Sequence, residues 1–263
     1  MGLNIAYRDT GSGPGVVLAH CSSGSHREWD ALGTLLQQEY RVIAPDLSGY
    51  GQSERWPENE TFNPFIDVEL LEALCDMADE AVHLVGHSYG GAMALEVARR
   101  HPHYVKSLSL IEPVCFHLLQ PGRREQAWQQ VHRVATAIIA AVQAGDQKRA
   151  ADIFMGFWFG RLRWWFMPKK IKHTIIDSMD KVAHEFAVLD QLPMQLDDYK
   201  KITLPVLLIK GSRSQRPAAA IVEVLDELLP AAESVNIAGA SHMSPLTHAG
   251  QVNELVYRFI SGH

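Results

Sequence analysis

The strongest indication of the fold is the segment Gly86-His87-Ser88-Tyr89-Gly90-Gly91. It follows a short apolar run at 82–86 that is typical of a buried strand, and it precedes a helical pattern at 89–100. A serine flanked by glycines at a strand-to-helix turn is the pattern of a nucleophile elbow, where strained backbone projects the serine side chain. Small residues two positions before and after the serine prevent steric clashes in so sharp a turn. The stretch therefore predicts an α/β sheet that carries a nucleophile, Ser88.

Strand-like and helix-like segments alternate toward both ends of the chain. Strands are expected at 3–8, 16–19, 41–47, 82–86, 105–111, 206–210 and 234–238, and helices at 28–38, 66–78, 89–100, 218–229 and 251–260. This alternation predicts a mostly parallel sheet flanked by helices, because parallel strands need helical crossovers. From 116 to 201 the pattern is helical only. We therefore predict one α/β core (1–115 and 202–263) with one inserted helical cap (116–201).

The composition excludes several classes of protein. The 263 residues are 47% hydrophobic and 21% charged, as in ordinary globular chains. A net charge of −6 argues against a nucleic-acid partner, since phosphate binding requires a basic face. No apolar run approaches the roughly 18 residues of a membrane span. Three cysteines and a first segment without a signal-peptide pattern lead us to expect reduced thiols and a cytoplasmic location.

Two further segments offer the groups that a serine nucleophile needs. The general base is expected on the loop after the last strand, where His242 stands in Gly239-Ala240-Ser241-His242-Met243. The developing oxyanion needs backbone N–H donors. Tyr89, next to the serine at the start of a helix, is expected to give one of them. The loop after the strand at 16–19 is expected to give the second from Ser22, with Cys21 as the alternative donor.

Together these segments resemble the α/β-hydrolase superfamily, in its esterase-like group with a helical cap. The resemblance rests on the loop at His20, the turn at 45–53, the serine elbow and the histidine loop, and it extends over nearly the whole chain. It implies an α/β-hydrolase fold and a catalytic triad in the order serine, acid, histidine. It also implies a buried, structural role for Asp46 and for His20. Cys21 replaces the glycine that usually follows this histidine, so its side chain is expected to narrow the pocket.

The acid of the triad is where the chain departs from the family pattern. The usual acid stands three residues beyond a glycine that ends a late strand; here that position holds Ser214, and no carboxylate occurs from 211 to 222. The superfamily has an alternative position, directly after the strand that follows the elbow helix. In this chain the alternative position holds Glu112, which we take as the acid. A Ser–His dyad, or an acid from the insertion such as Asp190, is left open.

The insertion carries the features that bear on the substrate. A small cap cannot bury all of its aromatic residues internally, so several are expected to roof the active site. As substrate contacts we single out Trp158, Trp164, Trp165 and Cys21. Basic residues are interleaved with these aromatics: Arg161, Arg163, Lys169, Lys170 and Lys172. They indicate a solvated surface, or else steering of a carboxylate or phosphopantetheine-bearing substrate to the entrance.

The sequence thus predicts a serine hydrolase that cleaves a carboxylic ester or a related acyl compound with an apolar or aromatic acyl group. The chemistry needs no metal and no organic cofactor. Two alternatives stay open: a C–C bond hydrolase or cofactor-free perhydrolase on the same triad, and a ligand-binding protein of this fold with weak turnover. Nothing in the sequence indicates an oligomeric state.

Overall fold

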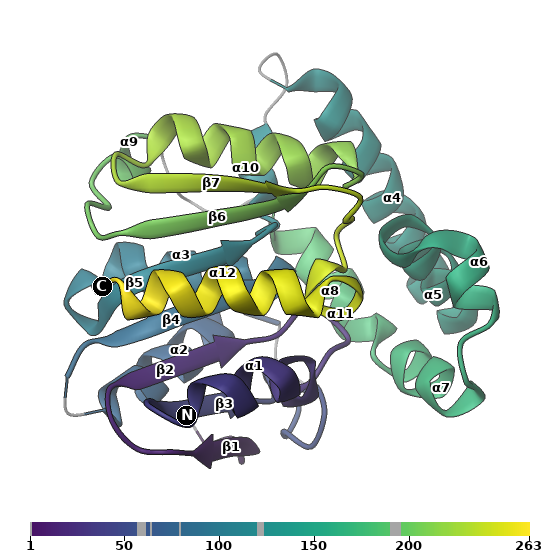
Figure 1. The fold of residues 1–263 in the computed structure, drawn as a ribbon. Coiled ribbons are helices and arrows are strands. Elements are labelled where there is room, and N and C mark those ends of the chain that lie inside the picture. Colours follow the sequence, from purple (N-terminus) through teal and green to yellow (C-terminus); the bar gives the residue numbers. More distant parts are fainter. Residues whose placement is uncertain (1, 57–61, 64, 79, 120–123, 190–195) are drawn as a thin grey trace.

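A seven-stranded sheet in the order β1-β3-β2-β4-β5-β6-β7 forms the centre of the molecule (Figure 1). The structure is a computed structural model, and it describes residues 2–56, 62–63, 65–78, 80–119, 124–189 and 196–263. Neighbouring strands are parallel except for β1 and β3. The strands are β1 (Tyr7–Thr10), β2 (Gly15–Ala19), β3 (Arg41–Pro45), β4 (Val82–His87), β5 (Val105–Ile111), β6 (Val206–Gly211) and β7 (Ala232–Ile237). The prediction of a mostly parallel sheet flanked by helices is confirmed.

Helices cover both faces of the sheet because the central strands are apolar on both sides. In β2, Val17 and Ala19 face one apolar cluster, whereas Val16 and Leu18 face the other. The first cluster is completed by α2 (Phe65–Asp76), α3 (Ser88–Arg100) and α10 (Arg216–Leu228). The second is completed by α1 (Asp30–Leu36) and α12 (Ala249–Ser261), which lie across the near face in Figure 1. A short 3-10 turn, η1 (His26–Trp29), leads into α1.

The first strand lies later in the chain than the sequence predicts. It spans Tyr7–Thr10 and pairs antiparallel with β3, so that Asp9 and Thr10 belong to the strand and not to the turn that follows. An ion pair at 2.7 Å between Arg41 on β3 and Asp9 supports this register. The prediction of a strand at 3–8 was wrong in its bounds. Asp9 and Thr10 are polar residues of an edge strand, so no alternation of apolar and polar residues marks them as part of it.

In its described part, the segment between β5 and β6 consists of helices joined by turns and loops, with no strand. Its helices α5, α6 and α7 project from the core beyond the carboxyl ends of the strands (Figure 1). Its helices are η3 (Phe116–Leu119), α4 (Glu125–Gln143), α5 (Gln147–Met155), η4 (Gly156–Gly160), α6 (Arg161–Trp165), α7 (Lys169–Asp177), α8 (Met179–Leu189) and α9 (Leu196–Tyr199). Within the residues that the structure describes, none of the helices combines the length and apolarity needed to cross a membrane.

The turn between β4 and α3 is packed too tightly for side chains other than hydrogen at its glycines. A Cβ atom built on Gly90 would lie 2.4 Å from the carbonyl oxygen of His20 and 2.5 Å from that of Ala19. A Cβ atom on Gly86 would lie 2.6 Å from the carbonyl oxygen of Gly90. Ser88 itself has a φ of 54°, in the left-handed region that strains a residue with a side chain. The glycines thus permit the close approach of α3 to β2 that the turn requires.

Gly90→Ala tests this packing. The added methyl group meets backbone on β2 that cannot move independently, so we expect the free energy of unfolding to fall by about 1–3 kcal/mol. Chemical denaturation measures this difference. Gly250→Ala on α12 is the matched control, because nothing lies within 4 Å of a Cβ atom built there. Equal stability of the two variants would contradict the packing described for the elbow.

Candidate active site

Three side chains at the carboxyl edge of the sheet form a continuous hydrogen-bonded chain. Ser88 stands at the start of α3, Glu112 directly follows β5, and His242 lies on the loop between β7 and α11 (Ser244–Thr247). The Ser88 hydroxyl donates to Nε2 of His242 at 2.9 Å, and Nδ1–H of His242 donates to Oε2 of Glu112 at 2.8 Å. The structure thus brings together the three residues that the sequence singles out as nucleophile, base and acid. The parallel strands bring these three residues together, because the carboxyl ends of parallel strands lie at the same edge of the sheet.

Glu112 is fully buried and fully hydrogen-bonded. Its Oε1 accepts the backbone N–H of Gly211 at 2.8 Å and the hydroxyl of Ser214. Ser214 occupies the position at which the family pattern has its acid, and here it donates to the carboxylate that lies one strand away. Burial alone raises the pKa of Glu112, but the hydrogen bonds from His242, Ser214 and Gly211 outweigh it and hold the pKa below its ordinary value. Glu112 is consequently an anion at neutral pH.

His242 is buried between the acid and an aromatic side chain of the helical segment. The ring of Trp158, on η4, lies 4.2 Å from the His242 ring between centroids. Gln215 donates from its amide to the carbonyl of Phe157 and so ties η4 to the core. Burial lowers the pKa of His242 below its ordinary value, although the Glu112 carboxylate opposes the shift. The imidazole is therefore neutral near pH 7 and able to accept a proton.

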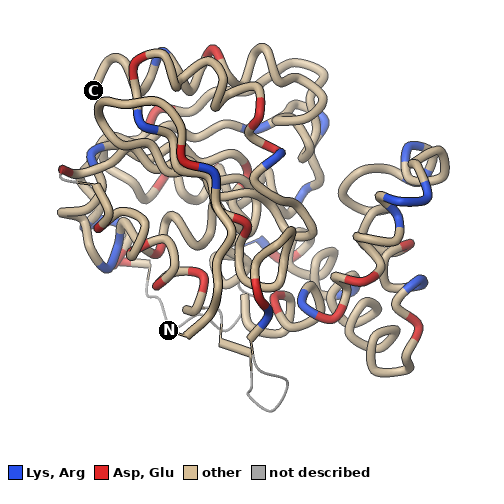
Figure 2. Tube along the Cα trace, turned by 90° about the horizontal axis from the view of Figure 1, so that it is seen from below, with Lys and Arg blue, Asp and Glu red and all other residues tan. Residues whose placement is uncertain are grey.

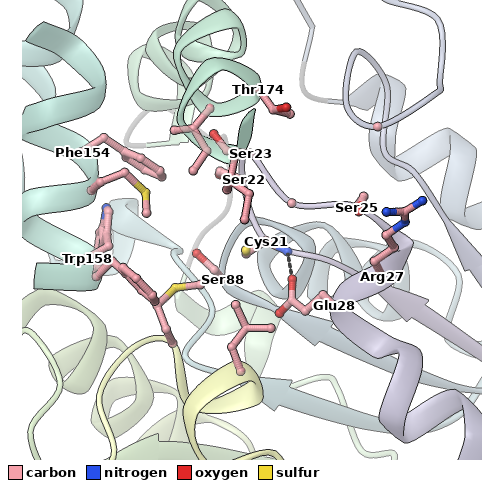
Figure 3. A pocket seen from close by; sticks show the side chains of 18 of the residues that line it. Cys21, Ser22, Ser23, Ser25, Arg27, Glu28, Ser88, Phe154, Trp158 and Thr174 are labelled. Atoms are coloured by element: carbon pink, nitrogen blue, oxygen red, sulfur yellow. Dashed lines mark hydrogen bonds between the residues drawn. The ribbon is translucent and has the colours of Figure 1, made fainter. Parts of the chain in front are cut away.

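The loop after β2 lies beside Ser88 and is held in place by hydrogen bonds. His20 is buried; its Nε2 accepts the backbone N–H of Leu47 at 2.9 Å, and its Nδ1–H donates to the carbonyl of Cys21. The N–H of Cys21 donates to Oε2 of Glu28 at 2.9 Å, which removes Cys21 as an oxyanion donor (Figure 3). Among the described residues, the N–H of Ser22 has no acceptor. The N–H of Tyr89 lies in the first turn of α3, where a helix offers no acceptor of its own. Both N–H groups are therefore available to a bound oxyanion.

Asp46 lies in the turn after β3 with its carboxylate buried. It accepts the backbone N–H of His26 at 2.7 Å and that of Gln52 at 2.8 Å, and the ring of His26 donates to the same carboxylate. Although burial raises the pKa of Asp46, these hydrogen bonds lower it below its usual range. Asp46 makes no contact with His242 and instead holds two loops together, as expected for a structural residue.

A buried ion pair that sequence reasoning missed lies beneath the nucleophile. His87, the residue before Ser88, donates from Nδ1 to Glu28 and from Nε2 to the backbone carbonyl of His242 at 2.8 Å. Burial disfavours charge on His87, but Glu28 more than compensates and raises the pKa of the imidazole. The ligand atoms of Cys21, Glu28 and His87 lie within 4.8 Å of one another. Since both nitrogens of His87 donate hydrogen bonds, the group serves to link the elbow to the His242 loop.

A second buried charge network, also missed, connects the helical segment to the oxyanion loop. From α8, Lys181 pairs with Asp67 at 2.9 Å, and Glu185 accepts the hydroxyls of Ser22 at 2.6 Å and Tyr50 at 2.7 Å. Lys181, Glu185 and Asp67 are at most 1% exposed. Burial raises the pKa of Glu185 to about 7, against the opposing charge of Lys181. Charged residues spaced four apart on a helix ordinarily indicate a solvated face, so only the fold reveals this network.

A cavity of about 610 Å³ opens onto Ser88 and His242 between the core and the helical segment. Of the residues expected to contact substrate, Cys21 and Trp158 line it, and Ser22 lines it as well (Figure 3). Trp164 and Trp165 do not: the buried Trp164 donates to Asp152 at 2.7 Å, and Trp165 is 75% exposed. Apolar side chains of the helical segment form much of the lining: Phe154, Met155, Trp158, Phe159, Met167 and Ile171. Asp190, the alternative acid, lies outside the described residues.

Comparisons with known proteins place the chain in a large family. Residues 16–255 match the model described as "Alpha/beta hydrolase family". A pimeloyl-[acyl-carrier protein] methyl ester esterase of Aeromonas hydrophila is 26% identical over 98% of this chain and 100% of its own. A 2-hydroxymuconate semialdehyde hydrolase of Pseudomonas is 38% identical over only 38% of this chain and 33% of its own. The solved structure of an alpha/beta hydrolase from a deep-sea metagenome superposes with a TM-score of 0.84 over 99% of this chain and 95% of its own, at 20% identity.

The raised pKa of Glu185 has a measurable consequence for stability. Between the ordinary value of 4.5 and about 7, the folded protein holds a proton on Glu185 that the unfolded chain has released. Native protein that binds more protons than unfolded protein loses stability as pH rises, so this residue lowers the free energy of unfolding across that window. Glu185→Gln removes the titration. Urea denaturation of Glu185→Gln and of the wild type at several pH values measures the effect. We expect the free energy of unfolding of the variant, minus that of the wild type, to increase from pH 4.5 to 7. A difference that stays constant with pH would contradict this expectation.

Proposed function

The chain belongs to the alpha/beta hydrolase family, and we propose that it is a serine hydrolase that cleaves a carboxylic ester or a related acyl compound through an acyl-enzyme on Ser88. The observation that carries the proposal is the hydrogen-bonded chain from Ser88 through His242 to Glu112, which opens onto the cavity. A serine hydroxyl is a weak nucleophile until a base removes its proton. The neutral imidazole at 2.9 Å is positioned to act as that base.

In the first half of the proposed reaction, His242 takes the proton of Ser88 as its oxygen attacks the substrate carbonyl. Glu112 holds the imidazole in the tautomer that accepts at Nε2 and stabilises the imidazolium that forms. The N–H groups of Ser22 and Tyr89 donate to the developing oxyanion, and the N-terminus of α3 adds a favourable dipole. His242 then protonates the leaving alcohol. In the second half, His242 activates a water molecule that releases the acyl group from Ser88.

The residues from 116 to 201 act as a cap in this proposal. Their aromatic and aliphatic side chains cover the carboxyl edge of the sheet and give the cavity its apolar wall, so we propose a substrate whose acyl group is apolar or aromatic. Trp158 lines the cavity and packs against the ring of His242, so we propose that it contacts the substrate beside the reacting atoms. Two relatives support hydrolysis as the reaction class, since one is named a methyl ester esterase and the other a semialdehyde hydrolase. The bond that this chain cleaves is then an ester bond or, in the alternative, a C–C bond.

Covalent labelling tests the identity of the nucleophile. A fluorophosphonate probe phosphonylates a serine only when a base activates its hydroxyl. We expect stoichiometric labelling of Ser88 in folded protein, read by peptide mass spectrometry, and none in Ser88→Ala. Ser109→Ala, a buried serine on β5 away from the triad, is the control and retains the label. If folded wild-type protein fails to label, the serine hydrolase proposal is overturned.

Glu112→Gln tests the assignment of the acid. The amide keeps the size of the side chain but removes the charge that stabilises the imidazolium, so kcat toward p-nitrophenyl esters is expected to fall by about 10⁴. KM is expected to change far less, because Glu112 does not line the cavity. Glu233→Gln, on the exposed side of β7, is the matched control and keeps wild-type turnover. A near-wild-type kcat in Glu112→Gln moves the acid elsewhere.

A further inference from the structure

Large apolar side chains are exposed to solvent where α6 is followed by α7. Leu162 is 72% exposed, Trp165 75% and Phe166 76%, and Ile171 on α7 is 48% exposed. These four residues are called the apolar tip below. All six tryptophans lie in the described part of the chain, and Trp165 is the one among them that is exposed. A Trp, a Phe and a Leu held in water on one short hairpin are unfavourable unless another surface covers them.

The same segment carries an unbalanced positive charge. Residues 153–176 contain five Lys and Arg and no Asp or Glu, within a chain whose net charge is −6. In Figure 2 the helical part that projects from the core carries several blue segments, with red segments also present on it. Lys172 donates to the carbonyl of Trp165 at 2.8 Å. The other four form no ion pair with any carboxylate that the structure describes, and they are called the basic collar: Arg161, Arg163, Lys169 and Lys170. Cations that have no described carboxylate partner and surround an apolar tip favour an anionic surface.

The apolar tip adjoins the entrance of the cavity. Ile171 belongs to the tip and also lines the cavity, and Lys170 of the basic collar lines it as well. Met167, which directly follows Phe166, is another lining residue. Across the entrance, Leu246 on α11 lines the cavity and is 53% exposed. An apolar path therefore leads from the exposed hairpin to the space above Ser88.

We propose that the α6–α7 hairpin is a docking surface for an anionic lipid bilayer, into whose interface the apolar tip inserts while the basic collar binds the headgroups. Aromatic and aliphatic side chains beside Lys and Arg are the combination that lies at the boundary of headgroups and acyl chains. An acidic protein partner also matches the collar, and it is the competing occupant that the binding measurements separate from a bilayer. The route of an acyl substrate from the bilayer into the cavity rests on the proposed function; the docking itself does not.

Vesicle co-sedimentation of the full chain carrying Ser88→Ala tests docking without turnover. We expect the protein to pellet with vesicles of phosphatidylglycerol and phosphatidylcholine at low salt, and to pellet weakly with phosphatidylcholine alone or in 1 M salt, because collar contacts with headgroups are screened. Trp165 supplies a second readout, since its emission shifts to the blue when the indole enters the interface. The other tryptophans are buried or half-buried and change little.

Two double variants separate the tip from the collar. Leu162→Ser/Phe166→Ser removes apolar contacts and keeps Trp165 as the probe, and Arg163→Gln/Lys169→Gln removes two charges; each is expected to weaken vesicle partitioning by about tenfold. Two matched controls lie away from the hairpin. Leu35→Ser/Met77→Ser removes exposed apolar residues on α1 and after α2, and Lys106→Gln/Lys200→Gln removes two charges near the starts of β5 and β6. Both controls are expected to partition like the parent.

Thermal unfolding midpoints establish that each variant is folded, so the result does not depend on activity. Loss of partitioning in the tip and collar variants, with unchanged controls, supports the proposal. The proposal is overturned if folded protein does not bind anionic vesicles, or if the tip and collar variants bind as well as the parent. It is also overturned if an acidic carrier protein or a second copy of this chain, measured by ultracentrifugation, occupies the hairpin while vesicles do not. A failure here leaves labelling of Ser88 unaffected.

Discussion

The hydrogen bond from His242 to Glu112 is the constraint on which the rest of the site depends. It joins the end of β5 to the loop after β7 across a distance of 130 residues in sequence, and it fixes the imidazole so that Nε2 faces Ser88. Glu112 can make this bond only because Ser214 and the N–H of Gly211 occupy its second oxygen. A buried carboxylate without such donors would be protonated and would lose its attraction for the imidazole. The acid, the base and the loop after β6 thus form one hydrogen-bonded unit.

Two buried charge networks hold that unit in register with its surroundings. The Glu28–His87 pair connects the oxyanion loop, the residue before the nucleophile and the carbonyl of His242. The Lys181–Glu185 network connects α8 to the side chain of Ser22. Buried ion pairs contribute little net stability, because desolvation offsets their attraction, but removing one partner is costly. Their effect is to fix geometry. The Ser22 side chain is held by Glu185 of the helical segment, and the neighbouring Cys21 N–H is held by Glu28 of the core, so the position of the Ser22 backbone N–H is fixed from both sides.

Much of the core could be predicted from the sequence, because its signals are local. The glycines around Ser88 and the apolar runs of β2, β4 and β5 each report a short-range steric or packing requirement, and the parallel sheet follows from them. The position of Glu112 was predicted from the family resemblance and from its place at the carboxyl end of a parallel strand near the elbow, since nothing near it in sequence marks it as a partner of His242. Its catalytic role, like those of Ser22 and Tyr89, stays a prediction.

The remaining features depend on contacts between distant segments. Lys181, Glu185 and Glu28 have the pattern of surface charges, and only tertiary packing buries them. Trp164 and Trp165 could not be separated by composition: successive residues on a helix point about 100° apart, so one is buried against Asp152 while the other faces solvent.

The most direct test of the account is to observe the covalent intermediate. Protein mixed with a p-nitrophenyl ester is quenched in acid within the first turnover, digested, and examined by mass spectrometry. If Ser88 is the nucleophile, the acyl mass appears on the peptide that contains Ser88, accumulates with the first equivalent of p-nitrophenol, and disappears as hydrolysis completes. An ester that is hydrolysed with no acyl adduct at Ser88, or with the adduct on another residue, would contradict it.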